Sequence, residues 1–396
     1  MNKLPLIVAL GAASLCSFAN AQSVQVYGRL YPFMVKESGS GATPAGTAVS
    51  SLSPSPTGTS GIGGTTGMVA GNSNLGFRGK EDLGDGLKAE FQLEGTLAVD
   101  SGASDGFRFN RNTFVGLAGK FGTVRLGNMD TVFKEYGDTL GMLGISSGTF
   151  LSSSDLLRKT GFGTSSASSF HLRRTNSLQW QSPEISGFQV GVQWSPGEAP
   201  SGSRNPTVKS IGVQYDSGPI YLALAHEIHD DMFGGSANAP SSQRNNGATD
   251  PTTSTDKATQ FTIEWRPQKT MRFEFDVIRK NYKENATVTG RFQSYQNTAY
   301  LLAMDLRFGL WRIDAHLVKA SAGSCSRVAT ACSTNGLNGT KMSLGAAYYL
   351  SKRTYLFGVV DQVRNGTSAR YDNTEFQSPA LGEDIRNIAM GVSHAF

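Results

Sequence analysis

The sequence predicts an all-β protein, a 16-stranded antiparallel transmembrane β-barrel with an inward-folded third loop. Three observations predict this class. The last ten residues alternate large apolar side chains with small or polar ones and end on an aromatic residue, Phe396. Runs with the same period of two recur along nearly the whole chain. Tight turns and long polar loops alternate between these runs, an asymmetry typical of outer-membrane barrels.

The terminal strand argues most directly for a barrel. Its large apolar residues are Ile388, Met390, Val392 and Phe396. In a water-soluble sheet, such a strand leaves an apolar edge with unpaired backbone groups, which invites aggregation. A closed barrel pairs that edge and turns the apolar side toward lipid. A soluble β-sandwich would bury the apolar faces against a second sheet instead. Periodicity alone does not exclude the sandwich, but the sandwich explains neither the terminal strand nor the alternation of turns and loops.

The N-terminus has the pattern of a secretory signal peptide. Lys3 supplies a positive charge, an apolar run covers 4–18, and Ala19-Asn20-Ala21 gives a small-residue cleavage site. We therefore expect a signal peptide over 1–21 and a single barrel domain over 22–396. A lipidated Cys16 is disfavoured because bulky Leu15 precedes it. No later stretch approaches the ~20 apolar residues that a spanning helix needs.

The strands are predicted from runs of about ten residues bounded by turn signals, a length that suits a tilted transmembrane strand. Seven tight turns join strands in pairs, which gives sixteen strands in all. The predicted strands are 24–35, 72–81, 86–97, 107–119, 122–130, 172–182, 187–195, 208–216, 219–229, 258–266, 269–281, 295–308, 309–319, 340–350, 353–364 and 385–396. In 269–281 and 309–319 one face suits lipid and the other suits water.

Two long loops differ in composition. Residues 38–71 are rich in Gly, Ser, Thr and Pro with almost no charge, which predicts a flexible external loop. Residues 131–171, after the fifth strand, contain many apolar residues, including Phe133, Tyr136 and Phe150. A solvated loop has no use for them, whereas a loop folded against the inner barrel wall does.

Composition offers little sign of other chemistry. Cys325 and Cys332 remain after signal cleavage, and in an oxidising compartment we expect a local disulfide between them. Too few ligands surround them for zinc, and the formal net charge of +5 is too small and dispersed for nucleic acid. His226-Glu227-Ile228-His229 lacks the helical spacing of a metal motif, so we interpret it as a solvated strand end. No cofactor, metal or catalytic constellation is expected, so an outer-membrane enzyme is the weaker alternative.

Beyond these patterns, the chain resembles the trimeric general porins of the neisserial and β-proteobacterial type. The resemblance covers nearly all of the mature sequence and rests on an ordered set of motifs. They are Val26-Tyr27-Gly28-Arg29, 75–84 continuing into 86–94, Phe114-Val115-Gly116-Leu117, 121–127, 349–354, and the closing Gly391-Val392-Ser393-His394-Ala395-Phe396.

The resemblance implies a homotrimer in the outer membrane of a Gram-negative bacterium, with a water-filled pore in each subunit for passive diffusion of small hydrophilic solutes. Lipid, lipopolysaccharide and the barrel assembly machinery are the implied partners, and Phe396 is the implied assembly signal. Loop 131–171 would narrow the pore, with acidic groups facing a basic wall. The implied wall residues are Arg29, Arg78, Arg111, and Arg173 or its neighbour Arg174, with parity favouring Arg173. The acidic candidates are Asp130, Glu135, Asp138 and Asp155.

Two departures from the family pattern bear on selectivity. Asn74 and Asn128 stand where the family commonly has arginine, although Arg78 lies on the same face as Asn74. The expected anion preference is therefore weak to moderate. A solute-specific porin for organic acids or sugars is the alternative, and a surface structure used mainly for adhesion is a further one.

Overall fold

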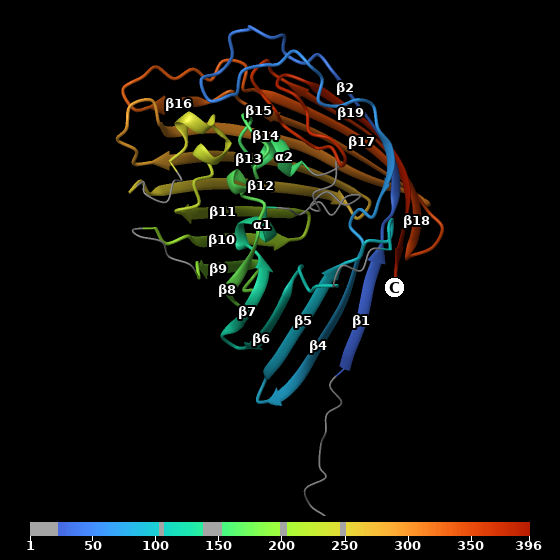
Figure 1. Cartoon of the computed structure of the whole chain (residues 1–396). Helices are drawn as coiled ribbons and strands as arrows, with labels where there is room; N and C mark the ends of the chain where they lie inside the picture. The colour runs from blue at the N-terminus through green and yellow to red at the C-terminus, as the bar shows by residue number, and fades with distance from the viewer. Residues whose placement is uncertain (1–22, 103–106, 138–152, 199–203, 246–250) are drawn as a thin grey trace, which may run out of the picture.

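In the computed structural model, residues 23–102, 107–137, 153–198, 204–245 and 251–396 are described. Figure 1 shows antiparallel strands wrapped into one continuous sheet. Its first strands are β1 (Ser23–Leu30), β2 (Phe33–Ser40), β3 (Thr66–Val69), β4 (Asn74–Gly84), β5 (Leu87–Thr96), β6 (Thr113–Gly119), β7 (Gly122–Asp130), β8 (Arg173–Gln181), β9 (Phe188–Pro196) and β10 (Thr207–Ser217). The others are β11 (Ile220–Asp230), β12 (Ser254–Gln268), β13 (Met271–Glu284), β14 (Phe292–Phe308), β15 (Trp311–Ala320), β16 (Ser324–Arg327), β17 (Gly339–Tyr349), β18 (Thr354–Asn365) and β19 (Asp384–Ala395).

The sheet closes into the predicted 16-stranded barrel. The first two barrel strands are each interrupted, so that β1 with β2 and β3 with β4 form one strand apiece. The short β16 lies beyond the end of β15 and pairs only with β14. The last strand, β19, pairs with β18 on one side and with β2 and the end of β1 on the other. Closure leaves most of this strand without an open edge, as the terminal alternation predicted.

The closing register differs from the expected one. β19 lies opposite Phe33–Ser40, and beyond a break at Tyr31 and Pro32 it meets only Arg29 and Leu30. The predicted partner segment, 24–35, is therefore displaced toward the N-terminus by several residues. Proline has no N–H for the ladder, and Val392 instead donates to the Pro32 carbonyl. Figure 1 shows β1, β4 and β5 extending past the C-terminus.

The predicted strands agree with the observed ones to within a few residues, with two kinds of exception. The short β3 and β16 were not predicted, and β6 begins at Thr113 instead of 107. In addition, β2, β12, β13 and β14 run further into the long loops than predicted. Their extra residues are largely polar on the outer face, as at Lys257 and Lys283. Apolar alternation in the sequence ends where a strand leaves the lipid, although the hydrogen-bonded pairing of that strand continues.

The two faces of the barrel have the predicted characters. In β15, Trp311 and Leu317 are exposed on the outer face, whereas Arg312, Asp314 and His316 are buried inside. The terminal strand β19 shows the same division: Met390 on its outer face is 65% exposed, and Asn387 on its inner face is fully buried. The outer face is therefore an apolar belt suited to lipid, and the inner face is polar.

Helices are few and short in the described parts of the chain. They are α1 (Val132–Tyr136), α2 (Ser154–Leu157), η1 (Ser166–Ser168), η2 (Ser236–Asn238) and η3 (Ser241–Gln243). Across those parts, no helix has the length and apolar character needed to cross a membrane.

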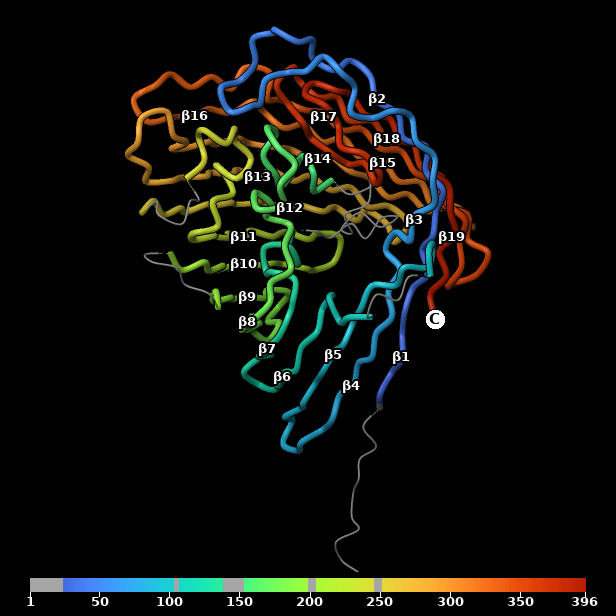
Figure 2. The backbone as a smooth tube through the Cα atoms, viewed as in Figure 1, coloured from blue at the N-terminus to red at the C-terminus, as the bar shows by residue number. Residues whose placement is uncertain are grey.

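The described parts of loop 131–171 pack against the inner face of the barrel. Phe133, Leu157 and Phe170 belong to a buried apolar cluster that also contains wall residues such as Ile278 and Tyr295. The backbone N–H of Phe133 donates to Ser210 Oγ of β10 over 2.8 Å. Figure 2 shows the segment around 153–171 crossing the strands β10–β13 instead of running along them. These contacts with inner-face residues explain the apolar composition of the segment.

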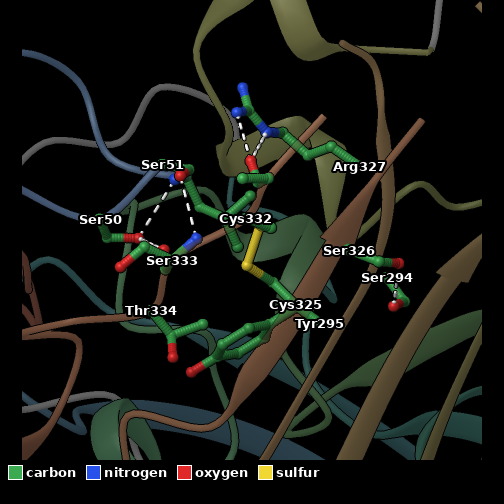
Figure 3. Close-up of a disulfide and its surroundings, with 12 residues drawn as sticks. Ser50, Ser51, Ser294, Tyr295, Cys325, Ser326, Arg327, Cys332, Ser333 and Thr334 are labelled. Atoms are coloured by element: carbon green, nitrogen blue, oxygen red, sulfur yellow. Dashed lines mark hydrogen bonds between the residues drawn. A yellow bond between two sulfur atoms is a disulfide. The ribbon is translucent and has the colours of Figure 1, made fainter. Parts of the chain in front are cut away.

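Hydrogen bonds join the loop over 41–65 to other long loops. Figure 3 shows its hydrogen bonds beside the disulfide that joins Cys325 to Cys332. Ser51 donates from its backbone N–H to the Ser333 carbonyl over 2.9 Å, and the Ser333 N–H donates to Ser51 Oγ over 3.0 Å. The disulfide thus fixes the hairpin that holds this loop. The mobility of 38–71 and the cleavage of 1–21 stay predictions, and the latter residues lie outside the described part.

Candidate functional site

The predicted basic residues lie along the inner face of the first barrel strands. Arg29 alternates with the exposed Val24 and Val26 of β1, and its Nε donates to Ser393 Oγ over 2.9 Å. Its guanidinium carbon lies 4.4 Å from the centre of the Tyr31 ring, within the range of a cation–π contact. Arg29 therefore projects inward at the seam where β19 meets β1.

Arg78 and Arg111 lie near one another around a shared tyrosine. The Arg78 guanidinium carbon is 4.7 Å from the centre of the Tyr27 ring, and its Nε donates to Gln25 Oε1 over 2.9 Å. Tyr27 donates its hydroxyl to Glu94 over 2.9 Å, and Arg111 forms an ion pair with the same carboxylate. Arg78 is exposed and Arg111 is half-buried. Two arginines with one carboxylate leave this stretch of wall basic.

Arg173 and Arg174 cannot be separated by strand parity, because β8 has a bulge at this point. The register with β7 shifts between Gly127 and Met129, and Asn176 has a positive φ of 55°. Arg173 binds Asp130 over 3.1 Å. Arg174 lies close enough to Glu227 for their charges to interact. The bulge therefore gives both arginines acidic neighbours.

The sequence interpretation missed Arg125 in β7. Its Nε donates to Glu90 Oε1 over 2.8 Å, and its guanidinium carbon lies 4.9 Å from the centre of the Phe114 ring. Its position between Val124 and Leu126 was a signal, because parity alone puts it on the inner face. With Arg78 and Glu90 it lines a recess of about 470 Å³.

The acidic candidates of the inward loop do not gather into one charged face. Asp130 is paired with Lys134 over 2.7 Å as well as with Arg173. Asp155 is paired with Lys341 of β17 over 3.1 Å. Glu135 accepts a hydrogen bond from the side chain of Gln181 over 2.9 Å. Asp138 lies outside the described residues. These carboxylates hold the loop and its flanks to the barrel.

Asn74 and Asn128, which stand where the family commonly has arginine, both donate hydrogen bonds to backbone carbonyls. Asn74 donates its side-chain amide to the Asn72 carbonyl over 2.9 Å. Asn128 donates likewise to the Arg111 carbonyl over 2.8 Å. Asn128 therefore helps to hold the backbone at Arg111, and it contributes no charge of its own.

Two further basic residues anchor the loop, and no local pattern indicated them. Lys280 of β13 is fully buried and donates to three loop carbonyls, those of Leu156, Leu157 and Lys159, over 3.3, 2.9 and 2.8 Å. Arg158 donates to Gln260 Oε1 over 3.0 Å and also contacts the Gly137 carbonyl. Together they fix both described ends of the loop to the wall.

The interpretation of residues 226–229 as a solvated strand end was wrong for half of them. Glu227 and His229 are buried on the inner face, 2.8 Å apart between Oε1 and Nε2, and the His229 ring stacks on Phe170 of the inward loop. The loop excludes water from this part of the wall, which the strand alone could not reveal. No group of metal-ligating side chains occurs among the described residues.

Glu135 should make the channel respond to pH. Burial, with Asp130 nearby, raises the pKa of this loop carboxyl to about 7. Between pH 5 and pH 9 the site gains one negative charge, so anion preference should fall as pH rises through 7. We expect Glu135→Gln to remove this step in reversal potentials, and Glu198→Gln, at an exposed position, to retain it. An unchanged step in Glu135→Gln would contradict the assignment.

The same shift has a consequence for stability. The folded protein holds the Glu135 proton more tightly than the unfolded chain does, because the folded-state pKa lies above the ordinary 4.5. The stabilising contribution is complete below about pH 4.5 and is lost as pH rises through 7.

Fold and lining together define a class of protein. The barrel is closed, its outer face is apolar, and its inner face is polar with a row of arginines on β1, β4 and β7. Such a barrel is an outer-membrane protein. The chain belongs to the Gram-negative porin family, whose model matches residues 7–368. The predicted family and location are thereby confirmed, and the family is one of porins, not enzymes.

Known proteins support the assignment in sequence and in fold. The chain is 35% identical over 187 residues to outer membrane porin protein 32 of Delftia acidovorans, covering 44% of this chain and 49% of that protein. It is 31% identical over 153 residues to major outer membrane protein P.IB of Neisseria lactamica, covering 39% and 41%. The aligned region thus spans about half, or less, of these curated relatives.

Solved structures show the same fold at lower identity. The anion-selective porin from Comamonas acidovorans matches with a TM-score of 0.69 at 21% identity, over 95% of this chain and 100% of that one. The trimer form of OmpT from Vibrio cholerae matches with a TM-score of 0.61 at 14% identity, over 95% and 100%.

Proposed function

We propose that the chain forms a water-filled channel for passive diffusion of small hydrophilic solutes and ions, with a weak to moderate anion preference. The distribution of buried and open inner surface carries the proposal. The inward loop covers the inner face of the later strands, where residues such as Tyr282, Tyr295 and Val318 are fully buried. The inner face of β1, β4 and β5 keeps partly exposed side chains, including Tyr27 and Arg78. Loop 131–171 therefore narrows the lumen toward the basic wall.

Charge on that wall supports the anion preference. Its inner face carries four arginines, Arg29, Arg78, Arg111 and Arg125, against the two carboxylates Glu90 and Glu94. A row of excess positive charge along a narrow, water-filled channel with low-dielectric walls raises the local concentration of anions. A homotrimer, contact with lipid and lipopolysaccharide, and insertion by the barrel assembly machinery are part of the same proposal. The trimer form of OmpT, a structurally similar outer membrane protein of Vibrio cholerae, supports the first of these.

Planar-bilayer recordings test the channel directly. Purified protein should produce stepwise, ohmic conductance increments, and a salt gradient should give a reversal potential of the sign that marks modest anion preference. The absence of steps from correctly folded barrels would overturn the proposal. A cation-selective reversal potential would overturn its anion preference alone.

Arg78→Gln should lower the anion preference without harming the fold. Arg78 is exposed in the lumen and its neighbour Gln25 is neutral, so its loss strands no buried carboxylate. Removing one screened charge should reduce the anion-to-cation permeability ratio about twofold. Arg353→Gln, at the exposed turn between β17 and β18, is the matched control and should leave the ratio unchanged. Equal ratios for both variants would show that the wall does not set selectivity.

A further inference from the structure

The loop over 41–65 is fixed where it returns to the barrel. Glu383, which is fully buried just before β19, accepts hydrogen bonds from the backbone N–H groups of Gly61 and Ile62, over 2.8 and 3.3 Å. The middle of the loop lies beyond these contacts, and its residues 50–55 are called the tip below. The tip therefore starts from a fixed base and meets other parts of the chain.

The tip is hydrogen-bonded to three segments that follow different strands. The Ser50 N–H donates to Ser368 Oγ over 2.8 Å, in the loop between β18 and β19. Gln243 Nε2, in the segment after β11, donates to the Ser51 carbonyl over 2.7 Å. Figure 3 shows the third contact, in which Ser50 and Ser51 bind Ser333 beside the disulfide. The tip thus joins segments that are far apart in the sequence.

Two of these three segments also bind the inward loop. Arg370, in the loop between β18 and β19, donates its backbone N–H to the Gly161 carbonyl over 2.7 Å. Asn238, in the segment after β11, accepts at Oδ1 from the Ser165 N–H over 2.8 Å. The hydrogen bonds of the tip therefore help to fix both segments that hold the inward loop over 161–165.

Packing links the tip to the inward loop as well. Leu52 is fully buried in the same apolar cluster as Phe162 of the inward loop. Pro54 lines a cavity of about 750 Å³ together with 162–165. Residues 46–57 include no charged side chain, so the tip provides contacts without changing the charge of the lumen.

We infer that the tip of the loop over 41–65 is a clamp that positions the inward loop and keeps the channel open. The inference rests on the proposed function, because it gives that channel a further positioning element. Lys280 holds the inward loop from the barrel wall, whereas the clamp holds 161–165 from the side of the long loops. Without the clamp, the inward loop should move between arrangements that pass more and less current.

Replacing 46–57 by the dipeptide Asn-Gly tests the clamp. The two legs of the loop meet there, since a Cβ on Gly58 would lie 3.0 Å from the Ala45 backbone nitrogen, and Asn-Gly suits a two-residue turn. Single-channel recordings should show transient closures about threefold more often than in wild type, because a weakly held segment opens locally at low cost. The reversal potential in a salt gradient should stay the same, because no charge is removed.

A single substitution and its neighbour provide a finer comparison. Gln243→Ala removes one hydrogen bond of the clamp and should raise the closure frequency less than the loop replacement does. Ser242→Ala, at the exposed adjacent position, is the matched control and should close as often as wild type.

A covalent bridge in the full-length chain tests the opposite change. Ser55→Cys with Thr164→Cys places two thiols at exposed positions on the same cavity, where a short bifunctional thiol reagent can join them. Cys325 and Cys332 are joined to each other and do not react. The bridge should lower the closure frequency below that of wild type. No bridge, or a bridge without effect on closures, would overturn the clamp even if the loop replacement does not fold.

The outcomes separate the clamp from the proposed channel. Normal conductance with an unchanged closure frequency in the loop replacement would overturn the clamp and leave the channel intact. If wild type passes no current, the proposed function fails, and amide hydrogen exchange over 161–168 then tests the clamp. Faster exchange in the loop replacement than in wild type would uphold the clamp, and equal exchange would overturn it.

Discussion

Deleting Phe396 should lower the outer-membrane level of the folded barrel at least tenfold. Phe396 closes the seam of the barrel, since its N–H donates to the Gly28 carbonyl over 3.1 Å and its carbonyl accepts from the Gly28 N–H over 3.3 Å. Its ring covers Gly28 so closely that a Cβ there would lie 2.5 Å from the ring. Two lost hydrogen bonds cost only about 2 kcal/mol. A much larger loss in cells would point to recognition by the assembly machinery, the role that we propose for this residue.

Two measurements separate the effect of that deletion on stability from its effect on recognition by the assembly machinery. Refolding into lipid vesicles needs no assembly machinery and should be impaired only slightly, with near-normal conductance from the channels that form. Levels in cells report recognition as well. Phe396→Tyr, which keeps an aromatic end, should restore the cellular level. Normal outer-membrane trimer levels after the deletion would contradict the assembly role. Equal losses in cells and in vesicles would show that Phe396 contributes only to the stability of the barrel.

Lys280→Met should destabilise the barrel by about 3 kcal/mol and loosen the inward loop. The substitution leaves three loop carbonyls without their buried donor, and each unsatisfied group costs roughly 1–3 kcal/mol, partly relieved by relaxation. We expect the heat-induced unfolding midpoint of the detergent-solubilised protein to fall by several degrees. Open-channel current noise should increase, because the loop that we propose to narrow the lumen is less firmly held.

A control variant and a second contact between loop and barrel wall help to interpret the Lys280→Met result. Lys257→Met changes an exposed lysine on the neighbouring β12 and should alter neither the midpoint nor the noise. Lys341 holds Asp155 independently, so the loop should remain inside the barrel in the single variant. An unchanged midpoint together with a quiet current in Lys280→Met would show that these hydrogen bonds do not anchor the loop.

Much of the barrel could be predicted because its signals are local. A lipid-facing strand must alternate, as Ile388, Met390 and Val392 do, and a tight turn must contain residues that allow it, such as Asp85 and Gly86 with positive φ. Inner-face positions follow by parity, which places Arg29 and would have placed Arg125. Parity fails where the backbone departs from regular pairing, as at the β8 bulge that gives both Arg173 and Arg174 acidic neighbours.

The sequence by itself determined the barrel and its two faces, because both depend on side chains a few positions apart. Only the tertiary structure decided what the loop residues do. Lys280 meets the Lys159 carbonyl across 121 residues, and Asp155 meets Lys341 across 186. Such long-range pairings produce no periodic pattern in the sequence. They make Lys280 and Asp155 anchors of the loop, a role that no local pattern in the sequence indicates.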